Sequence, residues 1–304
     1  MTSQALSPED VAGPEAAQRR QRSRPRSVLG PPAFSPLAIV GHLAKLWQYR
    51  DLLVTLTVHR IKVRYKQSAL GLAWAVLQPL ALMLIYTVIF STIARIQTDG
   101  APYAVFAYTA LLPWTTFATA LGNATTGLTS HSGLITKVYF PREILPLSYI
   151  VAALADFAIA ALVLAGLLIY YRIALTVQAL YVVPIVLAMM LFALAVSLFL
   201  SALQVRFRDI GVGLPLLLQI WMFATPVIYP LSAVAKSSRL PAGAKFVYNL
   251  NPMVGIVENF RRVVLQGLPP DRASLGLAVG VSLVLLPLAY AFFKRTEATM
   301  ADFI

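Results

Sequence analysis

"SGLITKVYFPREILPLS" (Ser132–Ser148) is a short polar segment between two long apolar runs. It carries charged side chains and an aromatic pair, Tyr139 and Phe140. Because charged groups are costly inside a lipid bilayer, the segment belongs in water, between two membrane-spanning helices. Pro141 and Pro146 prevent the two flanking spans from merging into one helix.

The composition indicates a membrane protein. Of the 304 residues, 59% are hydrophobic and 12% are charged, and the mean hydropathy is +0.74. Soluble domains are nearer half apolar and a quarter charged, so one aqueous core cannot cover this much apolar surface. The net charge of +13 favours basic residues that face the cytoplasm and anionic lipid over a nucleic-acid partner. The sequence contains no cysteine, which excludes disulfides and thiolate metal sites.

Six apolar runs have the length and composition of membrane spans, which need about 20 residues each. An even number places both termini on one side, and the distribution of Lys and Arg indicates that this side is the cytoplasm. The sequence therefore predicts an all-α polytopic membrane protein with one transmembrane domain over residues 36–304. The expected spans are 70–96, 103–128, 145–171, 180–203, 211–229 and 275–293.

Three segments outside the spans have their own signatures. Residues 1–35 are expected to form a disordered basic cytoplasmic tail, without a cleavable signal peptide. Residues 38–66 mix apolar and basic residues at helical spacing, which predicts an amphipathic helix in the membrane surface. Residues 230–271 are expected to form two short helices that re-enter the outer leaflet. Pro252 and Gly267 mark the first turn and the end of the second.

The sequence carries no enzymatic motif that we recognise. It lacks a phosphate-binding GxxxxGK[ST] loop, a dinucleotide fingerprint, and the HExxH and GxSxG motifs, and its three histidines lack metal-ligand spacing. We therefore expect no catalytic residue, metal or cofactor on this chain. The one acid within a predicted span is Asp156. We favour hydrogen bonds to hydroxyl or amide groups of neighbouring spans over a role in ion transport.

Aromatic residues in several spans are candidates to line a path through the membrane. Aromatic rings stack on the C–H faces of sugars, but Trp and Tyr also form belts at membrane interfaces. The sequence is compatible with both a channel-lining role and an interface role for these residues. The candidates for channel lining are Trp74, Tyr86, Trp114, Phe117 and Trp221.

Four separated segments resemble, in the same order, parts of the transmembrane subunit of type 2 ABC exporters for O-antigen, capsule and teichoic acid. They are "RIKVRYKQSALGLAWAVLQPL" (Arg60–Leu80), "PYAVFAYTALLPWTTF" (Pro102–Phe117), "LITKVYFPREILPL" (Leu134–Leu147) and "NLNPMVGIVENFRRVVL" (Asn249–Leu265). The resemblance extends from about Leu43 to the C-terminus and leaves out the N-terminal tail.

The resemblance implies a homodimer whose two copies form a membrane channel. It also implies two copies of a separate nucleotide-binding subunit, which would bind ATP and Mg and hydrolyse the ATP. The implied substrate is a glycan linked to undecaprenyl diphosphate. It would move from the cytoplasm to the outer face of a bacterial inner membrane.

The resemblance further implies that residues 132–146 couple the channel to the ATPase, with Tyr139 and Phe140 in an apolar pocket and Arg142 and Glu143 paired at its rim. From composition alone, a turn held in lipid headgroups fits equally well. The implied coupling residues are Leu134, Lys137, Tyr139, Phe140, Pro141, Arg142 and Glu143; the channel-entrance residues are Arg64, Tyr65, Leu70 and Gly71; the external re-entrant gate residues are Tyr229, Asn251, Pro252, Glu258 and Arg261.

Two other functions also fit the sequence. A secondary transporter would use its own ion gradient and depend on Asp156. A membrane glycosyltransferase or glycan polymerase would need acids or arginines on outer loops, for which Glu258, Arg261 and Arg262 are candidates. Copurification of an ATPase would favour the exporter over both. The sequence does not distinguish which glycan an exporter would carry.

Overall fold

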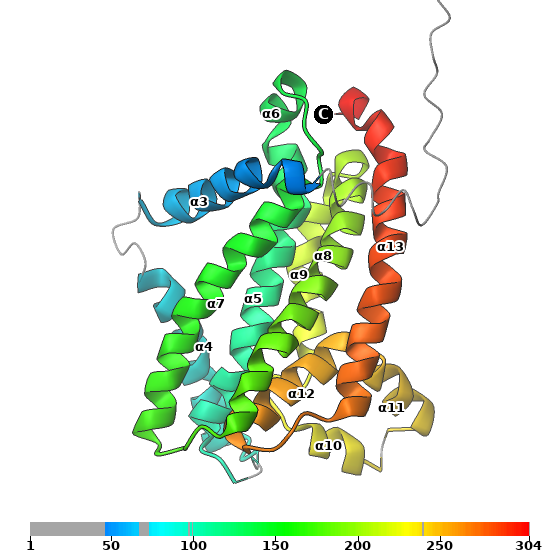
Figure 1. Cartoon of the computed structure of the whole chain (residues 1–304). Helices are drawn as coiled ribbons and strands as arrows, with labels where there is room; N and C mark the ends of the chain where they lie inside the picture. The colour runs from blue at the N-terminus through cyan, green and yellow to red at the C-terminus, as the bar shows by residue number, and fades with distance from the viewer. Residues whose placement is uncertain (1–45, 67–72, 97, 99, 239, 304) are drawn as a thin grey trace, which may run out of the picture. The chain divides into compact units, whose positions relative to one another are not determined.

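The chain folds as a series of apolar helices (Figure 1). This computed structural model describes residues 46–66, 73–96, 98, 100–238 and 240–303, all within the compact unit Phe34–Ile304. No strand occurs in these ranges, which confirms the all-α prediction. The helices are α3 (Arg50–Lys66), α4 (Ala73–Tyr86), the π-helix η1 (Thr87–Ile93), α5 (Tyr103–Ser130), α6 (Ser132–Lys137), α7 (Ile144–Tyr170), the 3₁₀-helix η2 (Val177–Tyr181), α8 (Val182–Arg206), α9 (Asp209–Phe223), α10 (Leu231–Lys236), α11 (Ala242–Asn249), α12 (Pro252–Leu265) and α13 (Arg272–Phe303).

Among the described residues, five helical segments are long and apolar enough to cross a membrane. They are α4 with η1, α5, α7, η2 with α8, and α13, and they correspond to five of the six predicted spans. The remaining predicted span corresponds to α9, which has only 15 residues. A helix of that length is about 22 Å long, whereas the hydrocarbon core of a bilayer is about 30 Å thick.

The N-terminal predictions are only partly covered by the structure. The predicted tail, residues 1–35, lies outside the described residues, as does the beginning of the predicted surface helix. The described part of that helix is α3, which packs against α7. In Figure 1, α3 lies across α7 rather than along it. A helix in this position crosses the bundle instead of extending it.

The central helix is α5, which contacts α4, α7, α8, α9 and α12. It is the least apolar of the five candidate spans, but it is also the most buried. The hydroxyl groups of Thr109, Thr116 and Thr125 each donate to the carbonyl oxygen four residues earlier. Because these polar groups are satisfied within the helix and the protein surrounds it, a threonine-rich span is tolerated here.

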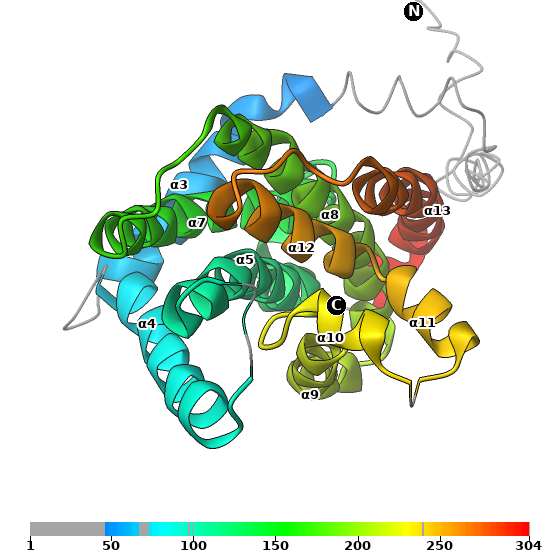
Figure 2. The same ribbon diagram turned by 90° about the horizontal axis from the view of Figure 1, so that it is seen from below.

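Three short helices, α10, α11 and α12, lie at the end of the bundle opposite α6 (Figures 1 and 2). The sequence predicted two helices in this region, and the structure contains one more. Each of the three begins at a proline: Pro230 and Pro241 precede α10 and α11, and Pro252 is the first residue of α12. Proline has a fixed φ that suits a first helical turn and lacks the N–H group that would be left unpaired there.

The bounds of α12 follow from its caps, and the prediction for them is confirmed. The Asn251 side chain accepts a hydrogen bond from the Met253 backbone N–H at 3.1 Å. At the other end, Gly267 has a φ of +62°, the left-handed conformation that favours glycine. Within the helix, Gly255 faces the start of α13, where a Cβ atom would lie 2.5 Å from the carbonyl oxygen of Ser274. The close approach of α12 to α13 therefore requires glycine at this position.

Gly255→Ala is expected to destabilise the protein. The added methyl group overlaps the backbone of α13, and overpacking of this kind costs about 1–3 kcal/mol, more than the ~1 kcal/mol that alanine gains over glycine in a helix. The measurement is the thermal unfolding midpoint of the detergent-purified protein. Gly276→Ala in α13 is the matched control, because a methyl group there meets nothing within 4 Å. Equal midpoints for the two variants would contradict this packing.

Candidate functional site

The polar segment between α5 and α7 projects at one end of the bundle, where α6 lies (Figure 1). After α6 ends at Lys137, the chain becomes extended at Val138. Lys137, Val138 and Tyr139 are exposed to solvent, and Tyr139 is 95% exposed. Almost none of its ring is covered by this chain. The segment therefore presents an aromatic tip beside a basic side chain.

The Phe140 side chain, unlike that of Tyr139, points into this chain. It is 5% exposed and packs in a buried cluster that includes Ile135 and Phe293, with Leu134 against the cluster's edge. Successive side chains of an extended segment point to opposite sides, so Tyr139 and Phe140 face opposite directions. The expectation that both rings enter one pocket of a partner is corrected accordingly. Tyr139 is available to a partner, whereas Phe140 joins the segment to the core of this chain.

Arg142 and Glu143 are bonded to the C-terminal helix α13. Glu143 is 4% exposed and accepts hydrogen bonds from Lys294 Nζ at 2.7 Å and from the Tyr290 hydroxyl at 3.2 Å. Lys294 Nζ also donates to Glu297 Oε2 at 2.7 Å, and Arg142 Nη1 donates to the Glu297 backbone carbonyl at 2.7 Å. The expected pair of Arg142 with Glu143 at the rim of a partner's pocket is thus replaced by contacts within this chain. A buried carboxylate needs a nearby cation, and Lys294 provides it.

Arg60 attaches α3 to α7. Its Nε donates to Ser148 Oγ at 2.8 Å, and its guanidinium carbon lies 3.3 Å from the centre of the Tyr149 ring. The same ring lies against Gly127 of α5, where a Cβ atom would be 2.5 Å from it. Burial lowers the pKa of Arg60, and the neighbouring Tyr149 opposes this shift. A cation over an aromatic face is an attractive arrangement, so these contacts fix α3 on the bundle.

Asp156, near the middle of α7, forms an ion pair with Arg64 of α3. The prediction named hydroxyl or amide groups of neighbouring spans, and a cation was not among them. Arg64 comes from the helix that lies across α7, and a nearby cation stabilises an acid within a span. Arg64 was expected at a channel entrance together with Tyr65, which also belongs to α3. The other two expected entrance residues, Leu70 and Gly71, lie outside the described residues.

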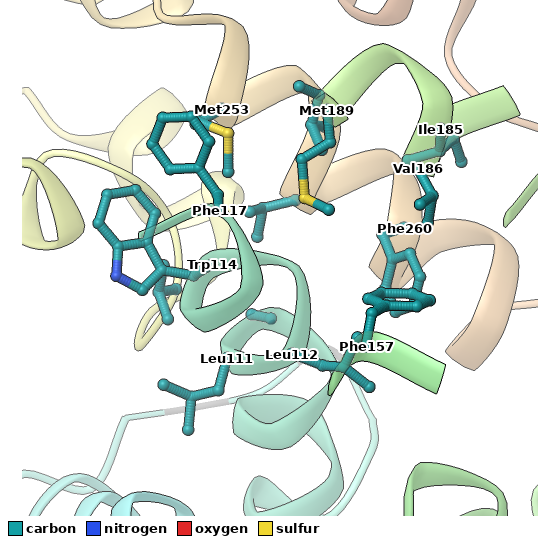
Figure 3. Close-up of a cluster of buried hydrophobic side chains, with 14 of the residues drawn as sticks. Leu111, Leu112, Trp114, Phe117, Phe157, Ile185, Val186, Met189, Met253 and Phe260 are labelled. Carbon is teal, nitrogen blue, oxygen red and sulfur yellow. The ribbon is translucent and has the colours of Figure 1, made fainter. Parts of the chain in front are cut away.

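Three of the candidate channel-lining residues form one aromatic cluster. The cluster consists of Trp114 and Phe117 of α5, Trp221 of α9 and Phe192 of α8. The centroids of neighbouring rings are 5.3–6.3 Å apart. Trp114 and Phe117 are buried, as Figure 3 shows among the surrounding side chains. Within a single copy of the chain, these rings pack helices together. Three of these pairs are edge-to-face, and aromatic pairs of this kind contribute about 0.5–1.5 kcal/mol beyond their burial.

The other two candidates lie on α4, the least covered of the candidate spans. Trp74 is exposed, and the Tyr86 hydroxyl, half-buried at the end of α4, lies 3.8 Å from Met222 Sδ. Few residues of the apolar stretch formed by α4 and η1 are buried. A π-helix such as η1 is rare and often occurs at functional sites. This helix presents an apolar surface that lipid or a second copy of the chain would cover.

Arg261 joins several elements at the end of the bundle opposite α6. It is 2% exposed, forms an ion pair with Glu258 at 3.0 Å, and lies over the ring of Phe106 at 3.8 Å. It also donates to the backbone carbonyls of Pro226 and Val227 at 2.8 and 3.2 Å. These contacts join α12 to α5 and to the turn that follows α9.

Asn251 and Tyr229 complete this junction. Asn251 Oδ1 accepts a hydrogen bond from Trp221 Nε1 at 3.1 Å, and Asn251 Nδ2 donates to Thr225 Oγ1 at 3.1 Å. The Tyr229 hydroxyl donates to the carbonyl oxygen of Phe223 at 2.7 Å. The structure therefore brings the expected gate residues together where α9 meets α12. Trp221 connects that junction to the aromatic cluster.

Sequence reasoning missed the residues of α13 that contact the polar segment. These residues are Tyr290, near the end of an apolar run, and Lys294 and Glu297, which follow it. Charged and aromatic residues at such a place commonly mark the membrane boundary. Only their pairing with residues about 150 positions earlier reveals a further role. Within the described residues, no group of three or more His, Cys, Asp or Glu side chains could hold a metal ion. The expectation that ATP and Mg bind another subunit stays a prediction.

Arg64→Gln and Asp156→Asn are each expected to destabilise the protein, and their effects should not add in the double variant. The pair is partly exposed, so we expect a coupling free energy on the order of 1 kcal/mol. Thermal unfolding midpoints of the single and double variants in detergent measure it. Lys62→Gln, an exposed position of α3, is the control and should leave the midpoint unchanged. Strictly additive single effects would show that the two side chains do not interact.

Residues 51–265 match the ABC-2 type transporter family. The chain is 33% identical over 260 residues to the O-antigen export system permease protein RfbA of Myxococcus xanthus. The aligned region covers 86% of this chain and 98% of that protein. A protein of the same name from Klebsiella pneumoniae is 28% identical over 256 residues, or 84% of this chain and 95% of the relative. The polysialic acid transport protein KpsM of Escherichia coli is 25% identical over 254 residues, with 81% and 93% covered. Taken with the helical bundle and its uncovered apolar spans, a match of this extent shows that the chain belongs to the ABC-2 type transporter family.

Proposed function

We propose that this chain is the channel-forming subunit of an ATP-driven exporter, which moves a lipid-linked polysaccharide of the O-antigen type to the outer face of a bacterial inner membrane. Membership of the ABC-2 type transporter family and the names of the relatives support this proposal. The structural observation that carries it is the exposed ring of Tyr139, held at the tip of a segment whose neighbouring residues are buried.

The partner that fits this tip is a separate ATPase subunit. The sequence has no phosphate-binding loop, so ATP and Mg would bind to the partner. An exposed aromatic residue beside a cation has the composition of an interface hot spot. Tyr139 would enter a pocket of the ATPase with Lys137 at its rim. Leu134, Phe140, Pro141, Arg142 and Glu143 would hold that tip in place from within this chain.

A homodimer would cover the apolar face of the bundle that carries α4 and α9. These two helices flank α5 on one face (Figures 1 and 2). Val212, Leu216 and Ile220 of α9 are exposed large apolar residues, as are several of α4. Two such faces, one from each copy, would enclose the path of the glycan, with its undecaprenyl diphosphate carrier at the lipid boundary. Trp74 and Tyr86 would line this path, with Trp114, Phe117 and Trp221 behind them.

In this proposal α9 and the turn that follows it make a sixth crossing. Both termini and α6 then lie in the cytoplasm, and α10, α11 and α12 lie outside. The short length of α9 is compatible with a crossing because the turn after it is closed by Arg261 and Asn251, which satisfy its carbonyl groups. The helix α3 would lie in the cytoplasmic surface of the membrane, with its basic side chains near anionic lipid.

The contacts of the relevant acids and arginines favour this function over the two alternatives. Asp156, on which a secondary transporter would depend, is paired with Arg64. Arg261, a candidate for glycosyl transfer, is buried and bonded to backbone carbonyls, and Glu258 is its ion-pair partner. Asp156 and Arg261 each join two parts of the bundle, and Glu258 pairs with Arg261 within α12; these are structural roles.

Tyr139→Ala is expected to weaken binding of the ATPase subunit. Truncation of a buried interface aromatic costs about 2 kcal/mol or more, which is roughly a 30-fold weaker Kd. The measurement is the amount of ATPase that copurifies with the variant, together with its hydrolysis rate. Tyr170→Ala is the control, since this residue is also an exposed tyrosine but lies at the opposite end of α7. Normal ATPase binding by Tyr139→Ala would contradict the docking role.

Phe140→Ala should behave differently from Tyr139→Ala. It empties a buried site and should cost about 3–5 kcal/mol of stability in this chain itself. We therefore expect a lower unfolding midpoint for the isolated permease, measured without the ATPase. A midpoint equal to that of the parent protein would show that Phe140 is not part of the core.

Cysteine labelling tests the proposed topology, because the sequence contains no cysteine of its own. A cysteine at the exposed residue Ser238, between α10 and α11, should react with a membrane-impermeant maleimide added outside. A cysteine at Ser130, at the end of α5, should react only after the cytoplasmic side is opened. The reverse pattern would contradict the orientation.

A further inference from the structure

The helix α13 is bonded at both of its ends to segments that the proposed function places on opposite sides of the membrane. At the C-terminal end, Lys294 Nζ lies 2.7 Å from both Glu143 Oε2 and Glu297 Oε2, and Arg142 Nη1 donates to the Glu297 carbonyl. This end is therefore joined to the segment that carries Tyr139.

The link between Lys294 and Glu143 is buried enough to be stiff. Glu143 is 4% exposed as a residue, and the Lys294 side chain is 15% exposed. In such surroundings the attraction between opposite charges is only weakly screened, and separation of the pair would leave a buried carboxylate unpaired. Phe140 and Phe293 pack in the same buried cluster beside it. The polar segment and the end of α13 are thus expected to move together.

The N-terminal end of α13 is joined in a similar way to the outer helix α12. Asn259 Nδ2 donates to Ser274 Oγ at 2.9 Å, and the Asp271 backbone N–H donates to Asn259 Oδ1 at 2.6 Å. Gly255 allows the two backbones to approach closely, as described above. Both joints lie on the same helix, Arg272–Phe303, and the stretch between Ser274 and Lys294 is about 30 Å long.

We propose that α13 transmits movement of the ATPase-facing segment to the outer helix α12, with Lys294 and Glu143 as the positioning residues at the cytoplasmic joint. This inference rests on the proposed function. The segment also continues directly into α5 and α7, so movement reaches those helices through the covalent chain. The ion pair adds a second route to a helix that is distant in sequence. Because that route depends on one non-covalent joint, substitution of Lys294 interrupts it and leaves α5 and α7 intact.

The test uses the complex with its ATPase subunit in membrane vesicles and a single cysteine at Gln266, the exposed residue that follows α12. The rate of labelling by an impermeant maleimide is measured without nucleotide and with ATP plus vanadate. In the parent we expect the rate to change with nucleotide. In Lys294→Gln we expect this change and export to be lost, while the ATPase stays bound and still hydrolyses ATP. Arg295→Gln, an exposed neighbour, is the matched control and should behave as the parent does.

Further variants of the same joint distinguish a positioning role of Lys294 from misfolding of the variant. Lys294→Arg, which keeps a cation between Glu143 and Glu297, should retain the response at Gln266 that Lys294→Gln loses. If Lys294→Gln does not accumulate, Glu143→Gln, which removes the charge from the other side of the same joint, takes its place: a lost response supports the inference, and a parental response overturns it. A parental response in Lys294→Gln itself overturns the inference and leaves the proposed function standing. A labelling rate in the parent that does not change with nucleotide overturns the inference, because α12 then does not respond to the ATPase; the proposed function fails only if export itself does not require hydrolysable ATP.

Discussion

A charged group that leaves water needs a partner of opposite charge or several hydrogen bonds, and this constraint fixes the arrangement of the helices. Apolar helices in lipid gain little from hydrophobic contact with one another, so polar contacts have a large share in selecting their neighbours. Among the described residues, several buried or half-buried charged side chains lie at joints between helices. Asp156 and Arg64 join α7 to α3, and Glu143 and Lys294 join the polar segment to α13. Arg261 joins α12 to α5 and to the turn after α9.

The two ends of the bundle differ in what these joints leave exposed. At the end that carries α6, the buried residues Phe140 and Glu143 hold a segment whose tip is open to solvent at Tyr139. At the other end, Arg261 and Asn251 satisfy the carbonyl groups of a turn and hold α12 against the bundle. A rigidly supported tip suits the docking of a partner subunit, whereas α12 at the other end is bonded to the spans through Arg261 and Asn251. Family membership and these two ends together support an ATP-driven export function.

Much of the fold could be predicted from the sequence because its signals are local. Long apolar runs predict spans, and the caps around Pro252 and Gly267 predict a short outer helix. Long-range pairs could not be predicted, because an isolated charge near a span does not reveal which distant residue will face it. From the sequence, Arg64 and Lys294 are both interpreted as cations at the membrane boundary. The structure shows that they pair with Asp156 and Glu143. The opposite directions of Tyr139 and Phe140 depend on which side of an extended segment meets α13, which composition does not contain.

The central claim is that ATP hydrolysis on a partner subunit drives a lipid-linked glycan through a channel built from this chain. Reconstitution of the purified chain with its ATPase in liposomes tests it most directly, with a labelled glycan on undecaprenyl diphosphate supplied on the ATPase side. A glycan-specific lectin measures its arrival on the opposite face. We expect arrival only when both subunits and hydrolysable ATP are present. Arrival driven by an ion gradient, with this chain alone and no ATP, would contradict the proposed function.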